Sequence, residues 1–235
     1  PNIEEHIKSI IDLKVPIVFT SAGNPNICTK ELKQKNIKVV HVVSSVKFAI
    51  KAESSGVDAI VAEGFEAGGH NGIEETTTMC LVPDVAKAIN VPLIAAGGII
   101  DGKSMLAAMI LGADGVQMGT RFVASKESSA HENFKNMVLK AKEGDTRLTL
   151  KEITPVRMMK NKFYKEVEEL YKSSPSKEQL LNKLGRGRAK LGMFEGDLEA
   201  GELEIGQASS QINKVFTAQE IIQQIVTEFN SIKSQ

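Results

Sequence analysis

The sequence predicts an α/β fold with parallel strands, either an open doubly wound sheet or part of a barrel of the (β/α)8 kind. Two observations carry this prediction. In the first half of the chain, short apolar runs alternate strictly with helix-type patterns, which indicates βαβ units with right-handed crossovers. Several apolar runs end in glycine-rich loops, as strands of α/β enzymes do at the sheet edge where ligands bind.

The predicted elements follow one another in a regular order as far as residue 122. An amphipathic helix at 2–13 comes first. Short buried strands are expected at 15–20, 37–43, 58–62, 92–96 and 115–118. Helices are expected at 26–35, at 44–53, after the capping threonines 76–78, and at 101–111 with Asp101 as cap. Five strands cannot close an eight-stranded barrel, and the chain begins with proline, so we expect the later part of a longer chain.

The pattern changes after residue 122. Residues 128–182 are predicted to be mostly helical and charged, without a further clear strand, and 185–216 are glycine-rich and irregular. A final amphipathic helix is capped by Thr217, and its isoleucine stripe must dock on another element. We therefore divide the chain into a barrel part at 1–125, a helical and irregular covering domain at 126–212, and a helix at 213–235 that returns to the barrel.

Composition excludes several classes of function. Basic and acidic residues number 29 each, so no basic field favours nucleic acid, and the absence of tryptophan argues against a base-stacking platform. No apolar stretch approaches the roughly 18 residues that span a bilayer, and no secretory signal is visible. Cys28 and Cys80 lie far apart and are read as reduced thiols. We expect a cytoplasmic protein without nucleic-acid or membrane partners.

The stretch 58–72 is the strongest candidate for a ligand site. An apolar strand ends there in glycines 64, 68, 69 and 72, which surround Glu63, Glu66 and His70. Glycines at this density suggest that the backbone approaches a ligand closely, although they also serve turns with positive φ. An imidazole here suits a general base or a hydrogen-bond donor to an oxyanion. The two glutamates either orient the loop or face solvent.

Two further loops predict a phosphate site. Gly97 and Gly98 follow the fourth strand, and Gly119 and Thr120 follow the fifth. Each loop precedes a helix, whose free N–H groups and dipole favour an anion. Such a pair on the last two strands is the usual phosphate site of a (β/α)8 barrel, and the hydroxyl of Thr120 adds a donor.

Three motifs together resemble the 2-nitropropane dioxygenase-like family: Glu63-Gly-Phe-Glu-Ala-Gly-Gly-His70, Ala95-Ala-Gly-Gly-Ile99 and Gly112-Ala-Asp-Gly-Val-Gln-Met-Gly-Thr-Arg-Phe122. That family contains nitronate monooxygenases and flavin-dependent enoyl-ACP reductases. The resemblance implies a TIM barrel, here lacking its first strands, with a smaller and mostly helical second domain over the active site. It also implies noncovalently bound FMN at the barrel mouth.

The resemblance assigns roles residue by residue. His70 matches the catalytic histidine beside the flavin, and Gly206-Gln207 matches a segment of the second domain that returns to the site. The implied cofactor contacts are Ser21, Ala22, Gly23, Glu63, Gly68, Gly69, Gly97, Gly98, Gln117, Gly119 and Thr120. The chain departs from the family in two ways. It lacks an early Ala-Pro-Met segment, and it has Ser209-Ser210 where a glycine is expected.

The first functional hypothesis is FMN-dependent oxidation of alkyl nitronates by O₂. The alternative is an enoyl-ACP reductase that uses NAD(P)H and an enoyl thioester. The absence of a G-x-G-x-x-G pattern after any strand favours the nitronate, a small-molecule substrate. Two other functions are compatible with the sequence: a non-catalytic binding protein and a flavin-free phosphosugar enzyme. Neither the physiological substrate nor the existence of a homodimer follows from the sequence.

Overall fold

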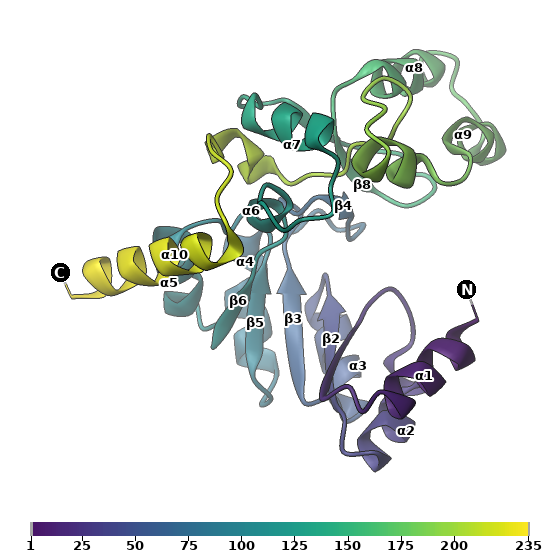
Figure 1. Cartoon of the computed structure of the whole chain (residues 1–235). Coiled ribbons are helices and arrows are strands. Elements are labelled where there is room, and N and C mark those ends of the chain that lie inside the picture. The colour runs from purple at the N-terminus through teal and green to yellow at the C-terminus, as the bar shows by residue number, and fades with distance from the viewer. Residues whose placement is uncertain (1, 235) are drawn as a thin grey trace.

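The computed structural model describes residues 2–234, which form two sheets with helices around them (Figure 1). The larger sheet has five strands in the order β1-β2-β3-β5-β6, and the smaller has three in the order β4-β8-β7. The strands are β1 (Ile17–Thr20), β2 (Lys38–Val43), β3 (Ala59–Glu63), β4 (Gly69–His70), β5 (Leu93–Ala96), β6 (Gly115–Gln117), β7 (Thr146–Thr149) and β8 (Val156–Met159).

Helices alternate with the strands of the larger sheet and then dominate the rest of the chain. The α-helices are α1 (Ile3–Asp12), α2 (Thr29–Gln34), α3 (Val46–Ser54), α4 (Thr78–Ala88), α5 (Gly102–Ile110), α6 (Thr120–Val123), α7 (Glu132–Leu139), α8 (Lys162–Tyr171), α9 (Lys177–Leu184) and α10 (Ala218–Lys233). Shorter turns are η1 (Pro25–Ile27), the π-helical η2 (Lys190–Phe194) and η3 (Gln207–Gln211). None of the helices between residues 2 and 234 combines the length and apolarity needed to cross a membrane.

All neighbouring strands of the larger sheet pair in parallel, which confirms the predicted α/β architecture. Its helix-covered face carries the main hydrophobic core, to which Val39, Ile60 and Leu93 belong. The opposite face has only a small apolar cluster. The prediction of a buried first strand is wrong, because β1 is an edge strand whose Ile17 and Phe19 remain 51% and 53% exposed.

The smaller sheet corrects the prediction that residues 128–182 contain no further strand. β7 and β8 are four residues long and pair antiparallel, and β8 pairs on its other side with β4, which contains His70. Each of the two strands carries an arginine, so neither has the apolar alternation that reveals a strand in the sequence. The pairing with β4 joins segments more than 80 residues apart, which no local pattern records.

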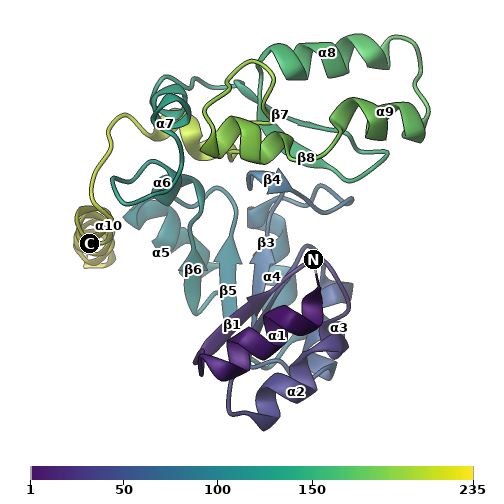
Figure 2. The same ribbon diagram turned by 45° about the vertical axis from the view of Figure 1, so that its right-hand side comes forward.

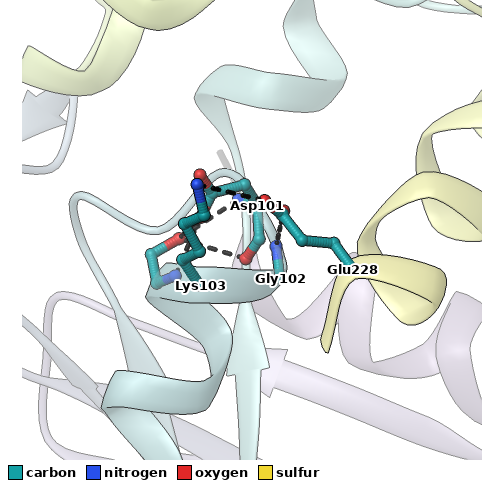
Figure 3. A network of polar contacts seen from close by, with 5 residues as sticks. Asp101, Gly102, Lys103 and Glu228 are labelled. Atoms are coloured by element: carbon teal, nitrogen blue, oxygen red, sulfur yellow. Dashed lines mark hydrogen bonds and ion pairs between the residues drawn. The ribbon is translucent and has the colours of Figure 1, made fainter. Parts of the chain in front are cut away.

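The last helix docks as expected. α10 packs along α5, and the N–H of Gly102 donates a 2.8 Å hydrogen bond to the carboxylate of Glu228, as Figure 3 shows. Lys103 adds an ion pair of 3.7 Å to the same carboxylate. A Cβ at Gly102 would collide with the backbone nitrogen of Phe229, so this close approach requires glycine.

The segment from α7 to η3 lies beyond the carboxyl ends of β3 and β5, as Figure 2 shows. The two ends of this segment lie side by side. Ser125 forms a parallel bridge with Phe216, and the N–H of Lys126 donates to the Phe216 carbonyl at 2.9 Å. Residues 126–216 therefore cover the sheet edge at which the glycine-rich loops lie, and they form the covering segment.

Candidate functional site

A cavity of about 210 Å³ lies between the larger sheet and the covering segment. Its floor is formed by the ends of β3, β5 and β6 and the loops that follow them, and its roof by η2 and residues 204–208. Of the predicted cofactor residues, Glu63, Gly68, Gly97, Gly98, Gln117, Gly119 and Thr120 line it. Loops from three neighbouring strands thus meet at one place, as the sequence motifs predict.

A second cavity, of about 330 Å³, lies next to the first. Ser21, Ala22 and Gly23 line it together with His70, and Glu63 belongs to the walls of both cavities. The predicted site residues therefore divide between two adjoining spaces that share one carboxyl group. Gly69 lines neither cavity, because it lies against the side chain of Glu204.

The glycines of the 58–72 stretch approach other parts of the same chain. A Cβ at Gly68 would lie 2.5 Å from the carbonyl carbon of Ile205 in the covering segment. A Cβ at Gly64 would collide with Thr78, and one at Gly72 would collide with Ser44. Of these three, only Gly68 also lines the first cavity. Close packing against other parts of the same chain, on backbone at Gly68 and on the side chain of Ser44 at Gly72, thus accounts for glycines that the sequence suggested were near a ligand.

Glu66 orients the loop and is not a solvated side chain. Its carboxylate accepts hydrogen bonds from the N–H of Thr78 at 3.1 and 3.0 Å and from the Thr78 hydroxyl at 3.0 Å. The start of α4 is therefore stabilised by a carboxylate from a preceding loop. The helix does begin at the predicted threonines, with Thr77 at the N-cap, but the side chain of Thr77 makes no capping bond and Glu66 takes that role.

Burial raises the pKa of Glu63 to about 7. Desolvation disfavours the ionised carboxylate, and no neighbouring cation among the described residues offsets that cost. Near neutral pH this carboxyl group is therefore available both as an acid and as a hydrogen-bond acceptor.

The two loops of the predicted phosphate site offer backbone amides. Within residues 2–234, the N–H groups of Gly98 and Gly119 have no hydrogen-bond acceptor. The hydroxyl of Thr120 accepts a 3.0 Å hydrogen bond from the N–H of Gly206, which leaves its own proton free to donate. The donor set predicted for an anion is thus present at the cavity wall.

The predicted contribution of the two helix dipoles is not supported. The start of α5 is occupied by protein carboxylates, because Asp101 accepts from the N–H of Ser104 at 2.8 Å and Glu228 accepts from Gly102. The helix after Gly119, α6, is only four residues long. The loop amides, rather than aligned helix ends, are therefore the donors available to an anion.

Comparison with known proteins agrees with the motifs. The sequence model of the family described as nitronate monooxygenase matches residues 2–228. This chain belongs to the nitronate monooxygenase family. A probable nitronate monooxygenase of Staphylococcus aureus (strain MRSA252) is 36% identical over 97% of the chain and 66% of that protein. One from Staphylococcus saprophyticus is 36% identical over 99% of the chain and 68% of that protein. The chain thus spans about two thirds of these relatives.

Solved structures give a similar result. FabK from Thermotoga maritima superposes with a TM-score of 0.91 at 40% identity, covering 100% of this chain and 74% of that one. A nitroalkane oxidase from Streptomyces ansochromogenes gives 0.81 at 25% identity, covering 99% and 69%. Membership of the nitronate monooxygenase family confirms the relationship that the sequence motifs predicted.

The sequence motifs did not indicate two charged residues that flank the His70 loop. Arg157 on β8 is fully buried against Phe65, and Glu204 lines the first cavity. Both belong to the covering segment. The alternation Glu202-Leu203-Glu204-Ile205 was the available signal for Glu204, because it places two carboxylates just before the Gly206-Gln207 motif.

Proposed function

We propose that the protein is an FMN-dependent oxidoreductase that oxidises alkyl nitronates, with His70 beside the flavin. One observation carries the proposal: the unpartnered amides of Gly98 and Gly119 and the carboxyl of Glu63 share a cavity that adjoins the cavity of His70. This arrangement supports an anion-binding end and an acid–base group at two sides of one site.

The residues present fit FMN. Its phosphate is a dianion that suits the amides of Gly98 and Gly119 and the hydroxyl of Thr120. A Cβ at Gly119 would meet nothing within 4 Å, so there is open space beside this loop. Besides these residues, we propose cofactor contacts for Ser21, Ala22, Gly23, Glu63, Gly68, Gly97 and Gln117, but not for Gly69, which lines neither cavity. When bound, FMN supplies electron transfer from the nitronate to O₂, which leaves a carbonyl compound and nitrite.

The chain's own residues bind and orient the substrate. His70 donates a hydrogen bond to the nitro group of a nitronate, or accepts the α-proton of a nitroalkane. Glu63, whose pKa burial raises to about 7, forms the wall between the two cavities, where its neutral form carries no charge against an incoming anion. The covering segment contributes the apolar side chains of Met193, Ile205 and Ala208 to the wall of the first cavity.

A second candidate is favoured by the 40% identity to FabK from Thermotoga maritima. In this alternative, NAD(P)H reduces the flavin, and an enoyl thioester on acyl carrier protein receives the hydride. The same loops would serve both reactions.

We also propose the division into 1–125, 126–212 and 213–235 as functional parts. The first part holds the cofactor loops, the second covers them, and the third packs α10 on α5. The two free thiols support a reducing compartment and therefore the cytoplasm.

The test is anaerobic flavin reduction in the purified protein, with propionate 3-nitronate and with NADH or NADPH in turn. Bleaching of the flavin absorbance by the nitronate alone is the expected result. Bleaching by the pyridine nucleotide alone would replace the proposal with the enoyl reductase. A protein that binds no flavin when FMN is added would contradict both.

A further inference from the structure

The carboxylate of Glu204 and the imidazole of His70 meet on one edge of β8. His70 pairs with Val156 on this strand, and Glu204 forms an antiparallel bridge with Met158. Because β7 occupies the other edge of β8, the two residues lie end to end along the same edge, two residue steps apart. A residue of the covering segment is thereby brought next to the loop that carries the histidine.

The side chain of Glu204 reaches back toward that loop. Its Oε2 atom lies 2.8 Å from the point where a Cβ of Gly69 would stand, so only glycine leaves room for it beside His70. The carboxylate accepts no hydrogen bond from the residues that the structure describes between 2 and 234. Its capacity to accept is therefore still available to an imidazole N–H.

Electrostatics separates Glu204 from the other acidic groups nearby. Burial raises the pKa of Glu204 above its ordinary value, and the electrostatic interaction with His70 opposes part of that rise. For Glu63, burial is the sole cause of the raised pKa, and for Glu202 the opposing cation is Arg188. Glu204 is thus the acidic residue of the site whose charge is coupled to His70.

We propose that Glu204 is a positioning residue for His70, which orients the imidazole so that the enzyme accepts neutral nitroalkanes as well as nitronates. This inference rests on the proposed function. A carboxylate that accepts one ring N–H fixes the tautomer and leaves the second nitrogen free to accept a proton.

The step that Glu204 assists is proton abstraction. The C–H bond next to the nitro group breaks, the proton passes to the free imidazole nitrogen, and the electron pair moves into the nitro group to give the nitronate anion. No oxidant is consumed in this step, and the new imidazolium lies beside an existing carboxylate. A nitronate added as such has already lost this proton, so its oxidation requires no base.

The experiment compares two substrates in one anaerobic assay. Flavin reduction is followed by stopped-flow with nitroethane and with preformed ethyl nitronate, in the wild type, Glu204→Gln and Glu204→Asp. Glu199→Gln is the matched control, because Glu199 is exposed on the same segment. Flavin content and circular dichroism check that each variant is folded and loaded.

We expect Glu204→Gln to slow reduction by nitroethane about 10- to 100-fold, the usual effect of losing a partner that orients a histidine. Reduction by ethyl nitronate should change less than about 2-fold, and Glu204→Asp should keep more of the nitroethane rate because it keeps the charge. Equal losses on both substrates would show a merely structural role and overturn the inference.

Two further outcomes separate this inference from the proposed function. A wild type reduced by ethyl nitronate but not by nitroethane overturns the inference alone. A wild type reduced by neither substrate overturns the proposed function and the inference with it.

Discussion

The guanidinium of Arg157 donates two hydrogen bonds, of 3.0 and 2.8 Å, to the carbonyl oxygen of Phe65 and lies over the ring of the same residue. Arg157 belongs to β8, whereas Phe65 belongs to the loop that leads to His70. The buried cation therefore ties the covering segment to the loop at a point five residues before the histidine.

Replacing Arg157 should destabilise the fold. Arg157→Met leaves the carbonyl of Phe65 without its donors inside the protein, and we expect a loss of about 3 kcal/mol in the free energy of unfolding. Urea denaturation followed by circular dichroism measures the loss. Arg147→Met is the control, since Arg147 is exposed on the neighbouring strand β7. Similar losses in both variants would contradict a specific role for Arg157.

Gly119→Ala tests the phosphate site without disturbing the protein around it. A Cβ at this position meets nothing within 4 Å, so the unfolding free energy of the flavin-free protein should be unchanged within about 0.5 kcal/mol. If FMN occupies the space beside this loop, its dissociation constant should rise about 10-fold, the equivalent of 1.4 kcal/mol. Fluorescence titration with FMN measures this change. An unchanged constant would place the phosphate elsewhere.

Glu202 should make stability depend on pH. Burial and the negative charge of Glu204, partly offset by Arg188, raise the pKa of Glu202 to about 7 from its ordinary 4.5. The folded protein thus holds this proton more tightly than the unfolded chain, so stability falls as pH rises between these two values.

A glutamine cannot ionise and escapes this loss. Glu202→Gln should be more stable than the wild type near pH 8, by at most about 3 kcal/mol, and should lose most of that advantage near pH 5. Urea denaturation at both pH values gives the comparison. Glu199→Gln, on an exposed position of the same segment, should show no such pH-dependent gain. A gain for Glu202→Gln that is equal at both pH values would contradict the assignment.

Gly102→Ala should release α10 from α5. The added Cβ collides with the backbone of Phe229, so the last helix must shift or detach. We expect faster amide hydrogen exchange across α10, with exchange in β3 and β5 unchanged. Gly56→Ala serves as a control, because it adds a methyl in open space at a glycine of positive φ far from α10. Protection of α10 that matches the wild type would show that its docking tolerates the methyl group.

The parts of the fold that depend on local chemistry were predictable from the sequence. Asp101 and Thr217 each form a capping box at the helix start where a cap was expected. The five parallel strands follow from apolar runs separated by helical patterns. Gly97, Gly98 and Gly119, which the motifs single out, line the first cavity, whereas their role in cofactor binding stays a prediction.

The remainder depends on contacts between distant segments. The role of Glu66 as the cap of α4 requires a partner 12 residues away, and Glu204 reaches the His70 loop only because both segments pair with β8. A glycine looks the same in a sequence whether it accommodates a ligand or another stretch of backbone. Gly68, which lies against Ile205 and also lines the cavity, does both.

The bridge between Ser125 and Phe216 has a consequence for how such enzymes diversify. Because the covering segment begins and ends at neighbouring points, it forms an insertion whose removal would leave a gap that a short turn can close. A different segment could be grafted at the same two points without moving β5 or β6. The covering segment can thus be exchanged as one piece while the strands of the larger sheet stay in place.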